Sequence, residues 1–545
     1  MGIPNHSEPE NEADPTRMSE SDPSAPDHSI KPSESSHNID WFIFTCTAAI
    51  IVGVCVPLIL FPEAGARSVN AAFDSITSNF GVFYVWSASA TVLFLLWLAL
   101  GRHGKVRLGP EGCRPEYSTF SWAAMLFCGG IGSTVLYWGT IEWAYYYQSP
   151  PFGVAPGSAA AVQWAMSYPI FHWGITGWAF YCLPAVAMAH AYHVRNIPSL
   201  RVSSACRAAI GSHADGILGR SFDLVFMVGL VGAAATGVGL SAPLINASIS
   251  RFAGIPEEDY MSMLTVVLGT LLFAASVYAG LDRGIKRLSN LNVIMALLFL
   301  AFVLVMGPTL FILKSTTDAI GIAIQNFVRM MTWTDPFTDS GFVENWTIFY
   351  WAWWLALGPF MGIFVSKISR GRTIREMIFG MLGYGSLGCM LFFSVLGNYA
   401  LYLELGGITP VLDTLNESGA PAAIVDVLLS LPSGRWLLPY FAVICLIFMA
   451  TTYDSASYTL ASCATRRLPA DSHPARWHRV FWALSLGLVP ITLLLLGGLK
   501  SLQTAAVVVS LPLIVVAVVM SVSLVKGLGE VEANAHDTRR PEETR

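Results

Sequence analysis

Tryptophan and tyrosine residues gather in two apolar stretches, near the places where a membrane helix would have its middle. In the first stretch, FHWGITGWAFY, a helical repeat of roughly 100° per residue places Trp173, Trp178 and Tyr181 in one sector of about 140°. These three rings can therefore line one side of a cavity. The second stretch, WTIFYWAWW, supplies four tryptophans: Trp346, Trp351, Trp353 and Trp354.

Rings arranged in this way can bind a cation that has no hydrogen-bond donors. The negative face of a ring attracts the charge, and each contact contributes about 0.5–1 kcal/mol when exposed and about 2 kcal/mol or more when dry. A bare ammonium group would need acceptors instead, and no acidic cluster accompanies the rings in the sequence. Bulky core packing together with an interfacial belt is the alternative. The pattern predicts a quaternary-ammonium site and leaves that alternative open.

The elements that must position these rings are membrane helices. Of the 545 residues, 54% are hydrophobic and 12% are charged, whereas about 25% of a typical soluble protein is charged. Crossing a bilayer takes about 20 apolar residues. We therefore expect an all-α polytopic membrane protein with about twelve transmembrane helices. The apolar windows are residues 41–62, 80–101, 119–147, 163–191, 220–248, 260–281, 289–314, 345–367, 376–404, 435–462, 478–497 and 504–526.

Basic residues fall in alternate loops, as in residues 102–114 and 466–479. Because basic loops stay on the cytoplasmic side, we expect both termini there and a multi-pass location in the plasma (inner) membrane. Residues 1–40 are polar and rich in proline and serine, which predicts a disordered tail. Residues 41–526 would form the transport domain, and residues 527–545 a short cytoplasmic tail.

Two ionisable residues, Glu142 and Asp454, lie in or near apolar windows. A charge at the centre of a membrane helix costs at least about 2.5–3.5 kcal/mol on insertion scales, so each is a functional candidate by default. A structural role fits each of them equally well. The nine cysteines are scattered without a CxxC pair, so neither a disulfide framework nor a metal site is expected.

Several function classes find little support in the sequence. A net charge of −5 gives no indication of a nucleic-acid partner. A membrane enzyme would need a catalytic cluster at membrane depth, and motifs such as HExxH and GxSxG are missing. A channel or receptor would need a filter or a sensing domain. We therefore expect a carrier rather than an enzyme, with the enzyme and the channel or receptor as alternatives.

The third and eighth windows are interrupted by glycine, at Cys128–Ser133 and at Gly358–Gly362. In many secondary transporters such helices unwind at mid-membrane, one in each of two inverted repeats, and free backbone groups for substrate and ions. Taken singly, each interruption could serve close packing. As a matched pair they predict two repeats, at about 119–314 and 345–526.

Three stretches resemble the betaine/carnitine/choline transporter family: FHWGITGWAFY, WGTIEWAYYYQSPPFG, and FYWAWW followed by SKISRGRTIREMIFG. The resemblance extends from about residue 40 to residue 526. It implies a LeuT-like core, which is a five-helix inverted repeat, preceded by two extra helices. It also implies alternating access for carnitine, glycine betaine or choline, and commonly a homotrimer.

The resemblance also implies roles for particular residues. The family's cation box falls on rings of the fourth and eighth windows, and its carnitine-exchanger branch adds a tyrosine and a methionine sulfur. A substrate carboxylate would lie near the unwound backbone of residues 129–133, because free N–H groups can hold an anion. The implied substrate-binding residues are Tyr145, Trp173, Trp178, Tyr181, Trp351, Trp353, Trp354, Met361, Gly129, Gly130 and Gly132, with Trp346 at an outer substrate site.

The coupling ion is left open by conflicting signals. Sodium-driven members use hydroxyls in the tenth window, and Thr451 and Thr452 fit that pattern. Met361 matches a position where sodium-independent carnitine exchangers carry a methionine, and Lys286 lies near the place of a basic residue whose charge replaces sodium. We favour a carnitine-type carrier without a cofactor, and a sodium-coupled betaine or choline symporter is the alternative.

Overall fold

Helices make up nearly all of the chain that the computed structural model describes, which is residues 39–110, 112–129, 132–279, 282–466, 473–496 and 498–537. Within these residues no β-strand is present. Backbone pairing of the β type is confined there to two isolated bridges, Ile39 with Thr465 and Arg107 with Thr373. The predicted all-α fold is therefore confirmed.

Each predicted window overlaps one helix or a run of consecutive helical segments. Three π-helical turns, Val343–Ile348, Met381–Gly385 and Phe393–Gly397, continue neighbouring α-helices. The α-helices are α1 (Trp41–Leu60), α2 (Pro62–Leu100), α3 (Thr119–Gly129), α4 (Ser133–Gln148), α5 (Ala159–Trp173), α6 (Ile175–His193), α7 (Val202–Ala205), α8 (Arg207–Ile210), α9 (Ile217–Ala253), α10 (Asp259–Ala279), α11 (Asp282–Met306), α12 (Thr309–Gln325), α13 (Phe327–Thr332), α14 (Phe349–Ile368), α15 (Ile374–Gly380), α16 (Ser386–Phe392), α17 (Asn398–Leu405), α18 (Val411–Ser418), α19 (Ala420–Leu429), α20 (Gly434–Cys463), α21 (Arg476–Leu496) and α22 (Gly498–Asp537).

The chain is a multi-pass membrane protein. Among the described residues, ten helices are long and apolar enough to cross a membrane, and the bent pair α3 and α4 raises the number to eleven. The fourth predicted window corresponds to α5 and α6, which meet at Gly174 and are not in that set. A helix rises 1.5 Å per residue, so α2, with 39 residues, is longer than one crossing of the bilayer requires.

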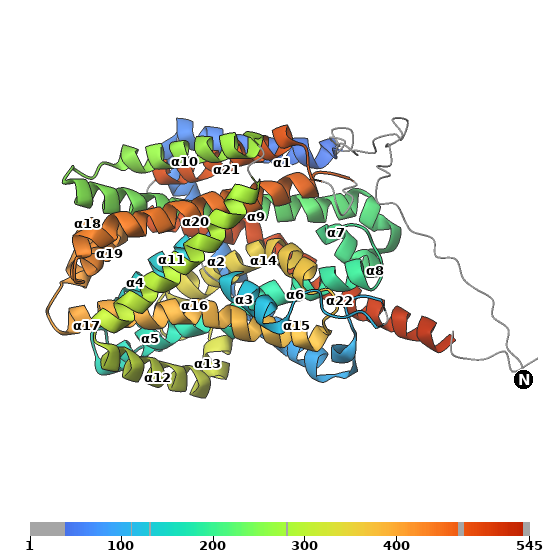
Figure 1. Cartoon of the computed structure of the whole chain (residues 1–545), viewed down its shortest axis with the longest axis horizontal. Coiled ribbons are helices and arrows are strands. Elements are labelled where there is room, and N and C mark those ends of the chain that lie inside the picture. Colours follow the sequence, from blue (N-terminus) through green and yellow to red (C-terminus); the bar gives the residue numbers. More distant parts are fainter. Residues whose placement is uncertain are drawn as a thin grey trace, which may run out of the picture. The chain divides into compact units, whose positions relative to one another are not determined.

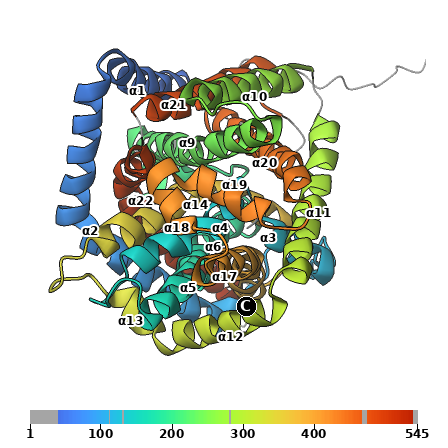
Figure 2. The same cartoon turned by 90° about the vertical axis from the view of Figure 1, so that its left-hand side faces the viewer.

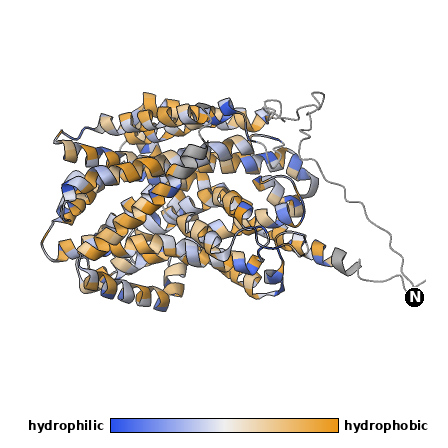
Figure 3. Ribbon diagram, in the orientation of Figure 1, coloured by the Kyte–Doolittle hydropathy of each residue, from blue (hydrophilic) through white to orange (hydrophobic). Residues whose placement is uncertain are grey.

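Burial separates central helices from outer ones. In the most apolar windows of α9 and of the span that contains α14, 78% of the residues are buried, against 22% in α1 and 28% in α11. Figure 2 shows α4, α6 and α14 in the middle, with α1, α2, α11 and α12 around them. In Figure 1, α10, α21 and α1 run side by side along the upper edge. Apolar residues cover these outer helices (Figure 3), which suits contact with lipid.

Helix α14 is continuous through Pro359, so the interruption predicted there is wrong. A Cβ atom on Gly358 would lie 2.8 Å from the carbonyl oxygen of Phe180, and one on Gly362 would lie 3.1 Å from the backbone nitrogen of Ala185. Glycine therefore lets α14 approach α6 closely.

The break predicted in the third window is present. Helix α3 ends at Gly129 and α4 begins at Ser133, with a bend of 61° between them. Gly130 and Ile131 lie outside the described residues. A second break, at Gly174 between α5 and α6, was not predicted from the sequence.

A hydrogen bond holds the chain near the start of the described region, and an ion pair holds it near the end. The backbone N–H of Asp40 donates to the carbonyl of Ala464, over 2.8 Å, so the last two residues of the predicted tail lie against the end of α20. The rest of that tail lies outside the described residues. At the other end α22 continues past the predicted boundary at residue 526, and Glu530 pairs with Arg195 at 2.7 Å.

Candidate functional site

Five of the predicted rings lie together where the end of α5, the start of α6 and the middle of α14 meet. All five are buried, and the most exposed of them, Tyr181, has 8% of its surface accessible. We call this group the aromatic cluster. Its members are Trp173, Trp178, Tyr181, Trp353 and Trp354.

The rings of the aromatic cluster contact one another directly. The centroid of Trp173 lies 5.6 Å from that of Trp353 and 5.5 Å from that of Trp354, with interplanar angles of 85° and 74°. Tyr181 lies 4.5 Å from Trp354 and 5.4 Å from Trp178. Such edge-to-face and tilted pairs are favourable contacts for aromatic rings. A cation that binds among these rings must therefore move some of them apart.

The break at Gly174 brings the rings of α5 and α6 to α14. The single helical sector expected for Trp173, Trp178 and Tyr181 does not exist, because Trp173 ends one helix and the other two residues belong to the next. Small residues make room for the rings. A Cβ atom on Gly177 would lie 2.6 Å from Cε2 of Trp354.

Gly129, at the break between α3 and α4, lies next to the aromatic cluster. A Cβ atom on Gly129 would lie 3.2 Å from Cε of Met361 and 3.9 Å from Cη2 of Trp178. Three predicted site residues from three helices therefore meet at this point. Gly132 has more space, since its nearest neighbour would be Oγ1 of Thr134 at 4.0 Å.

Two other predicted residues, Tyr145 and Trp346, form a pair of their own. Their ring centroids are 5.0 Å apart, and Trp138 lies 5.8 Å from Trp346. Tyr145 also lines a cavity of about 410 Å³ together with residues of α9, α19, α21 and α22. That volume is within the usual range for small-molecule sites.

Trp351 is buried on another side of α14. Its recorded ring contacts are with Phe171 at 5.4 Å, His172 at 5.5 Å and Phe180 at 5.8 Å. Among the described residues it therefore packs against α5 and α6 rather than against the aromatic cluster.

Within the part of the chain that the structure describes, a single buried carboxylate accompanies the aromatic cluster. Glu142 of α4 has no exposed surface. Its Oε2 accepts hydrogen bonds from Nε1 of Trp173, at 2.9 Å, and from the hydroxyl of Tyr350, at 2.5 Å. Its Oε1 accepts one from the hydroxyl of Tyr146 at 2.6 Å. Glu142 thus bonds directly to a ring of the aromatic cluster.

The sequence carried a signal for this carboxylate. An ionisable residue inside an apolar window is a functional candidate, and Tyr146 follows Glu142 by four residues, which places both on one face of α4. Tyr350 and Trp173 belong to distant segments. Their contacts with Glu142 could not be deduced from spacing.

Comparison with known proteins identifies the family. The model described as "BCCT, betaine/carnitine/choline family transporter" matches residues 42–533. The chain belongs to this family. The uncharacterized transporter YeaV of Escherichia coli (strain K12) is 38% identical over 426 residues, which are 78% of this chain and 88% of that protein. A protein named carnitine transporter, from Acinetobacter baumannii (strain ATCC 19606), is 37% identical over 484 residues, 88% of each chain.

In this betaine/carnitine/choline transporter the two threonines predicted as coupling-ion candidates lie in α20. Thr451 and Thr452 both donate to the carbonyl of Phe448, over 3.0 and 2.9 Å. Their oxygens keep lone pairs that could contact a cation. The side chain of Lys286 lies outside the described residues. Within the described ranges no three His, Cys, Asp or Glu side chains come close enough to hold a metal ion.

Asp454 is also part of an ion pair in this transporter. Its Oδ1 lies 3.1 Å from Nη2 of Arg479, and the side chain of that arginine is 5% exposed. Arg479 therefore supplies a positive charge beside Asp454. The observation favours the structural role for this residue.

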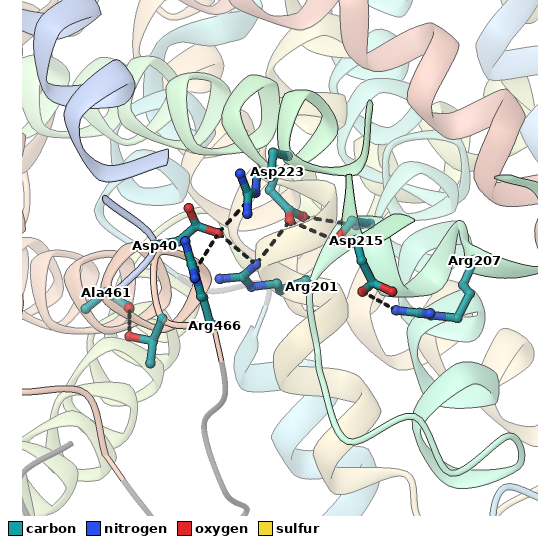
Figure 4. A network of polar contacts seen from close by, with 10 residues as sticks. Asp40, Arg201, Arg207, Asp215, Asp223, Ala461 and Arg466 are labelled. Atoms are coloured by element: carbon teal, nitrogen blue, oxygen red, sulfur yellow. Dashed lines mark hydrogen bonds and ion pairs between the residues drawn. The ribbon is translucent and has the colours of Figure 1, made fainter. Parts of the chain in front are cut away.

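A second buried carboxylate of the transporter lies among arginines (Figure 4). Oδ2 of Asp40 is 3.8 Å from Arg201, 3.5 Å from Arg220 and 3.7 Å from Arg466. Asp223 lies 3.8 Å from the same Arg201. We call these five residues the Asp40 cluster. They come from the segment before α1, the loop before α7, helix α9 and the end of α20, so their charges tie four parts of the chain together.

An exposed pair lies next to the Asp40 cluster in Figure 4. Arg207 donates to Oδ1 of Asp215 over 2.5 Å, and the side chain of Asp215 is 70% exposed. The hydrogen bond from Arg207 lowers the pKa of the Asp215 carboxyl.

Proposed function

We propose that this transporter carries a small quaternary-ammonium solute, carnitine or a close relative such as glycine betaine or choline, by alternating access. The trimethylammonium group would bind among the rings of the aromatic cluster. The observation that carries this proposal is the gathering of five buried rings from three helices, α5, α6 and α14. The name of the carnitine transporter of Acinetobacter baumannii also supports it.

The charge of such a solute suits a cage of rings better than a polar pocket. Its methyl groups have no N–H to donate, so hydrogen-bond acceptors gain nothing from it. Each desolvated ring contact contributes about 2 kcal/mol or more. Several rings together can offset the cost of removing the cation from water.

The other end of the solute would lie near the break between α3 and α4. A carboxylate could accept hydrogen bonds from backbone N–H groups at the start of α4, a helix of 16 residues whose dipole favours an anion there. Met361 would line the site beside Gly129. Tyr145 and Trp346, next to the cavity of about 410 Å³, would form an outer substrate site.

For coupling, we favour a sodium-independent carrier of the carnitine type, because Met361 matches the methionine of sodium-independent carnitine exchangers and lies beside the break at Gly129. A sodium-coupled betaine or choline symporter is the second candidate. The adjacent hydroxyls of Thr451 and Thr452 support it. We also propose an inner-membrane location with cytoplasmic termini, from the basic loops, and a homotrimer, from the family resemblance.

Uptake into proteoliposomes tests these assignments. Labelled carnitine, glycine betaine and choline would be offered with and without sodium, and with and without unlabelled solute inside. Uptake by preloaded vesicles alone would identify an exchanger, and uptake that depends on a sodium gradient would identify a symporter. Failure to take up any of the three solutes in all conditions would refute the proposed substrate class.

A further inference from the structure

We propose that Glu142 supplies the fixed negative charge of the cation site, which attracts a quaternary-ammonium group to the aromatic cluster, and that it also orients Trp173. This inference rests on the function proposed above and deepens it, because it names the group that makes the site selective for a charged ligand. Glu142 acts through the indole of Trp173, so it is a positioning residue rather than a direct contact of the ligand.

The groups around Glu142 suit an ionised carboxyl group, and its ionisation is part of the proposal. An indole N–H can only donate, and the hydroxyls of Tyr146 and Tyr350 can donate as well, so both carboxylate oxygens can act as acceptors. Hydrogen bonds to the ionised form are the kind that stabilise a buried carboxylate.

The remaining neighbour, His172, can complete the network as a neutral ring. When the hydroxyl of Tyr146 donates to Glu142, it can accept from Nδ1 of His172, at 2.9 Å. Nε2 of His172 lies 3.1 Å from the hydroxyl of Thr347, from which it can then accept. In this arrangement the ring carries one hydrogen, on Nδ1, and adds no positive charge.

Among the residues that the structure describes, no arginine or lysine compensates the charge of Glu142 through an ion pair, and its one ion-pair neighbour there is His172, at 3.7 Å. An ionised group at this depth is costly unless a cation comes near it. The aromatic cluster, whose Trp173 is bonded to Glu142, is the place where such a cation would lie.

This arrangement selects the chemistry of the ligand. A primary ammonium group could displace Tyr350 or Trp173 and bond to the carboxylate itself, which would break the network. A fully methylated nitrogen has no hydrogen to donate, so it would bind over the rings and leave all three hydrogen bonds in place. The bond to the carboxylate also polarises the indole of Trp173 and makes its face more attractive to a cation.

The test compares ligands that differ only in charge. Choline and glycine betaine would each be paired with the isostere in which a tert-butyl group replaces the trimethylammonium group. Binding to the purified full-length protein would be measured by isothermal titration for the parent and for Glu142→Gln. In the variant we expect the affinity for each cation to fall by at least about tenfold, because a charge in a low-dielectric site acts strongly. The affinity for the tert-butyl isosteres should stay within about twofold.

Two further variants separate charge from packing. Glu404→Gln makes the same change at a carboxylate that accepts from the backbone of Leu412, away from the aromatic cluster, and should leave every affinity unchanged. Glu142→Asp keeps the charge but shortens the side chain. It should lower affinity for a cation while the ratio of cation to isostere affinity stays close to that of the parent. This variant keeps the test decisive if Glu142→Gln does not fold.

The ratio of cation to isostere affinity distinguishes the outcomes. If Glu142→Gln weakens cations and isosteres equally, or if Glu142→Asp loses the preference for cations, Glu142 has only a structural role and the inference is overturned. If the parent protein itself shows no preference for choline or glycine betaine over the isosteres, the proposed function fails instead. The two failures are therefore distinguishable.

Discussion

Glu142 and Asp40 are both buried carboxylates, but Glu142 is held by tyrosine and tryptophan donors whereas Asp40 lies among three arginines (Figure 4). In the Asp40 cluster, the arginines of the protein itself supply the positive charge beside each carboxylate. Glu142 is satisfied in hydrogen bonds but not in charge. The comparison teaches that the identity of the donors, and not burial, separates a carboxylate that joins segments from one that can attract a ligand.

The two environments also differ in what a substitution should change, the free energy of unfolding or the affinity for a ligand. A buried ion pair gains little over apolar packing, but removing one partner leaves an uncompensated charge and is strongly destabilising. A carboxylate whose hydrogen-bond donors are all neutral keeps its negative electric field, and this field can attract a mobile cation. We therefore expect changes in the Asp40 cluster to affect folding, and changes around Glu142 to affect binding.

The largest effect is expected from Asp40→Asn. This change leaves Arg201, Arg220 and Arg466 without their shared carboxylate, and the free energy of unfolding should fall by about 3 kcal/mol. Thermal unfolding in detergent would measure the loss, and the KM of the folded protein should not change. Asp426→Asn is the control, since its pair with Arg251 is largely exposed and is worth at most about 1 kcal/mol. A changed KM with unchanged stability would contradict the structural role of Asp40.

Two smaller changes form a matched pair. One removes a neutral donor from Glu142, and the other removes a neutral donor from Asp223, the second carboxylate of the Asp40 cluster. Tyr350→Phe takes a hydroxyl from Glu142, which has no basic partner, and should cost about 1.5–3 kcal/mol, as expected for a hydrogen bond to a charge. Ser203→Ala takes a hydroxyl from Asp223, which keeps the backbone N–H of residue 203 and its contact with Arg201. We expect about 1 kcal/mol there. The free energies of unfolding of both variants would be measured in the same detergent. A larger loss for Ser203→Ala than for Tyr350→Phe would contradict the comparison.

The third prediction removes a ring while leaving the charge of Glu142 in place. Trp354 contacts Trp173, Trp178 and Tyr181 but does not bond to Glu142. Trp354→Ala should raise the Kd for a quaternary-ammonium solute about 30-fold, because one desolvated cation–π contact contributes about 2 kcal/mol. Trp97→Ala, on the half-exposed face of α2, should have no effect on Kd. Equal losses in both variants would place the rings of the aromatic cluster outside the site.

The aromatic cluster was accessible to sequence reasoning because its members repeat within short stretches of apolar sequence. The break after Gly129 was predictable for the same reason. The glycines beside Pro359 were misinterpreted, since glycine permits both an unwound helix and a close approach of two helices, and only the contact with Phe180 decides between them.

The hydrogen bonds around Glu142 and the ion pairs around Asp40 could not be predicted from the sequence. Glu142 bonds to residues 31 and 208 positions away in the chain. Asp40 meets arginines from three separate segments, including one near the end of α20. Such contacts depend on how helices pack, and the local pattern around each carboxylate contains only one hint, the tyrosine four residues after Glu142.

The smallest effect is expected at an exposed carboxylate, Asp215. It tests whether a carboxylate must be buried for its arginine partner to affect stability. The hydrogen bond from Arg207 lowers the pKa of Asp215 below its ordinary value of 3.8. A lowered pKa means that the pair stabilises the folded protein above that ordinary value, and that this contribution is lost as the pH falls through the folded pKa. In Arg207→Gln the unfolding temperature should therefore drop slightly near neutral pH, by the equivalent of less than about 1 kcal/mol. At a pH below the folded pKa of Asp215 the two proteins should converge, and a difference that persists there would show that Arg207 acts through packing rather than through charge.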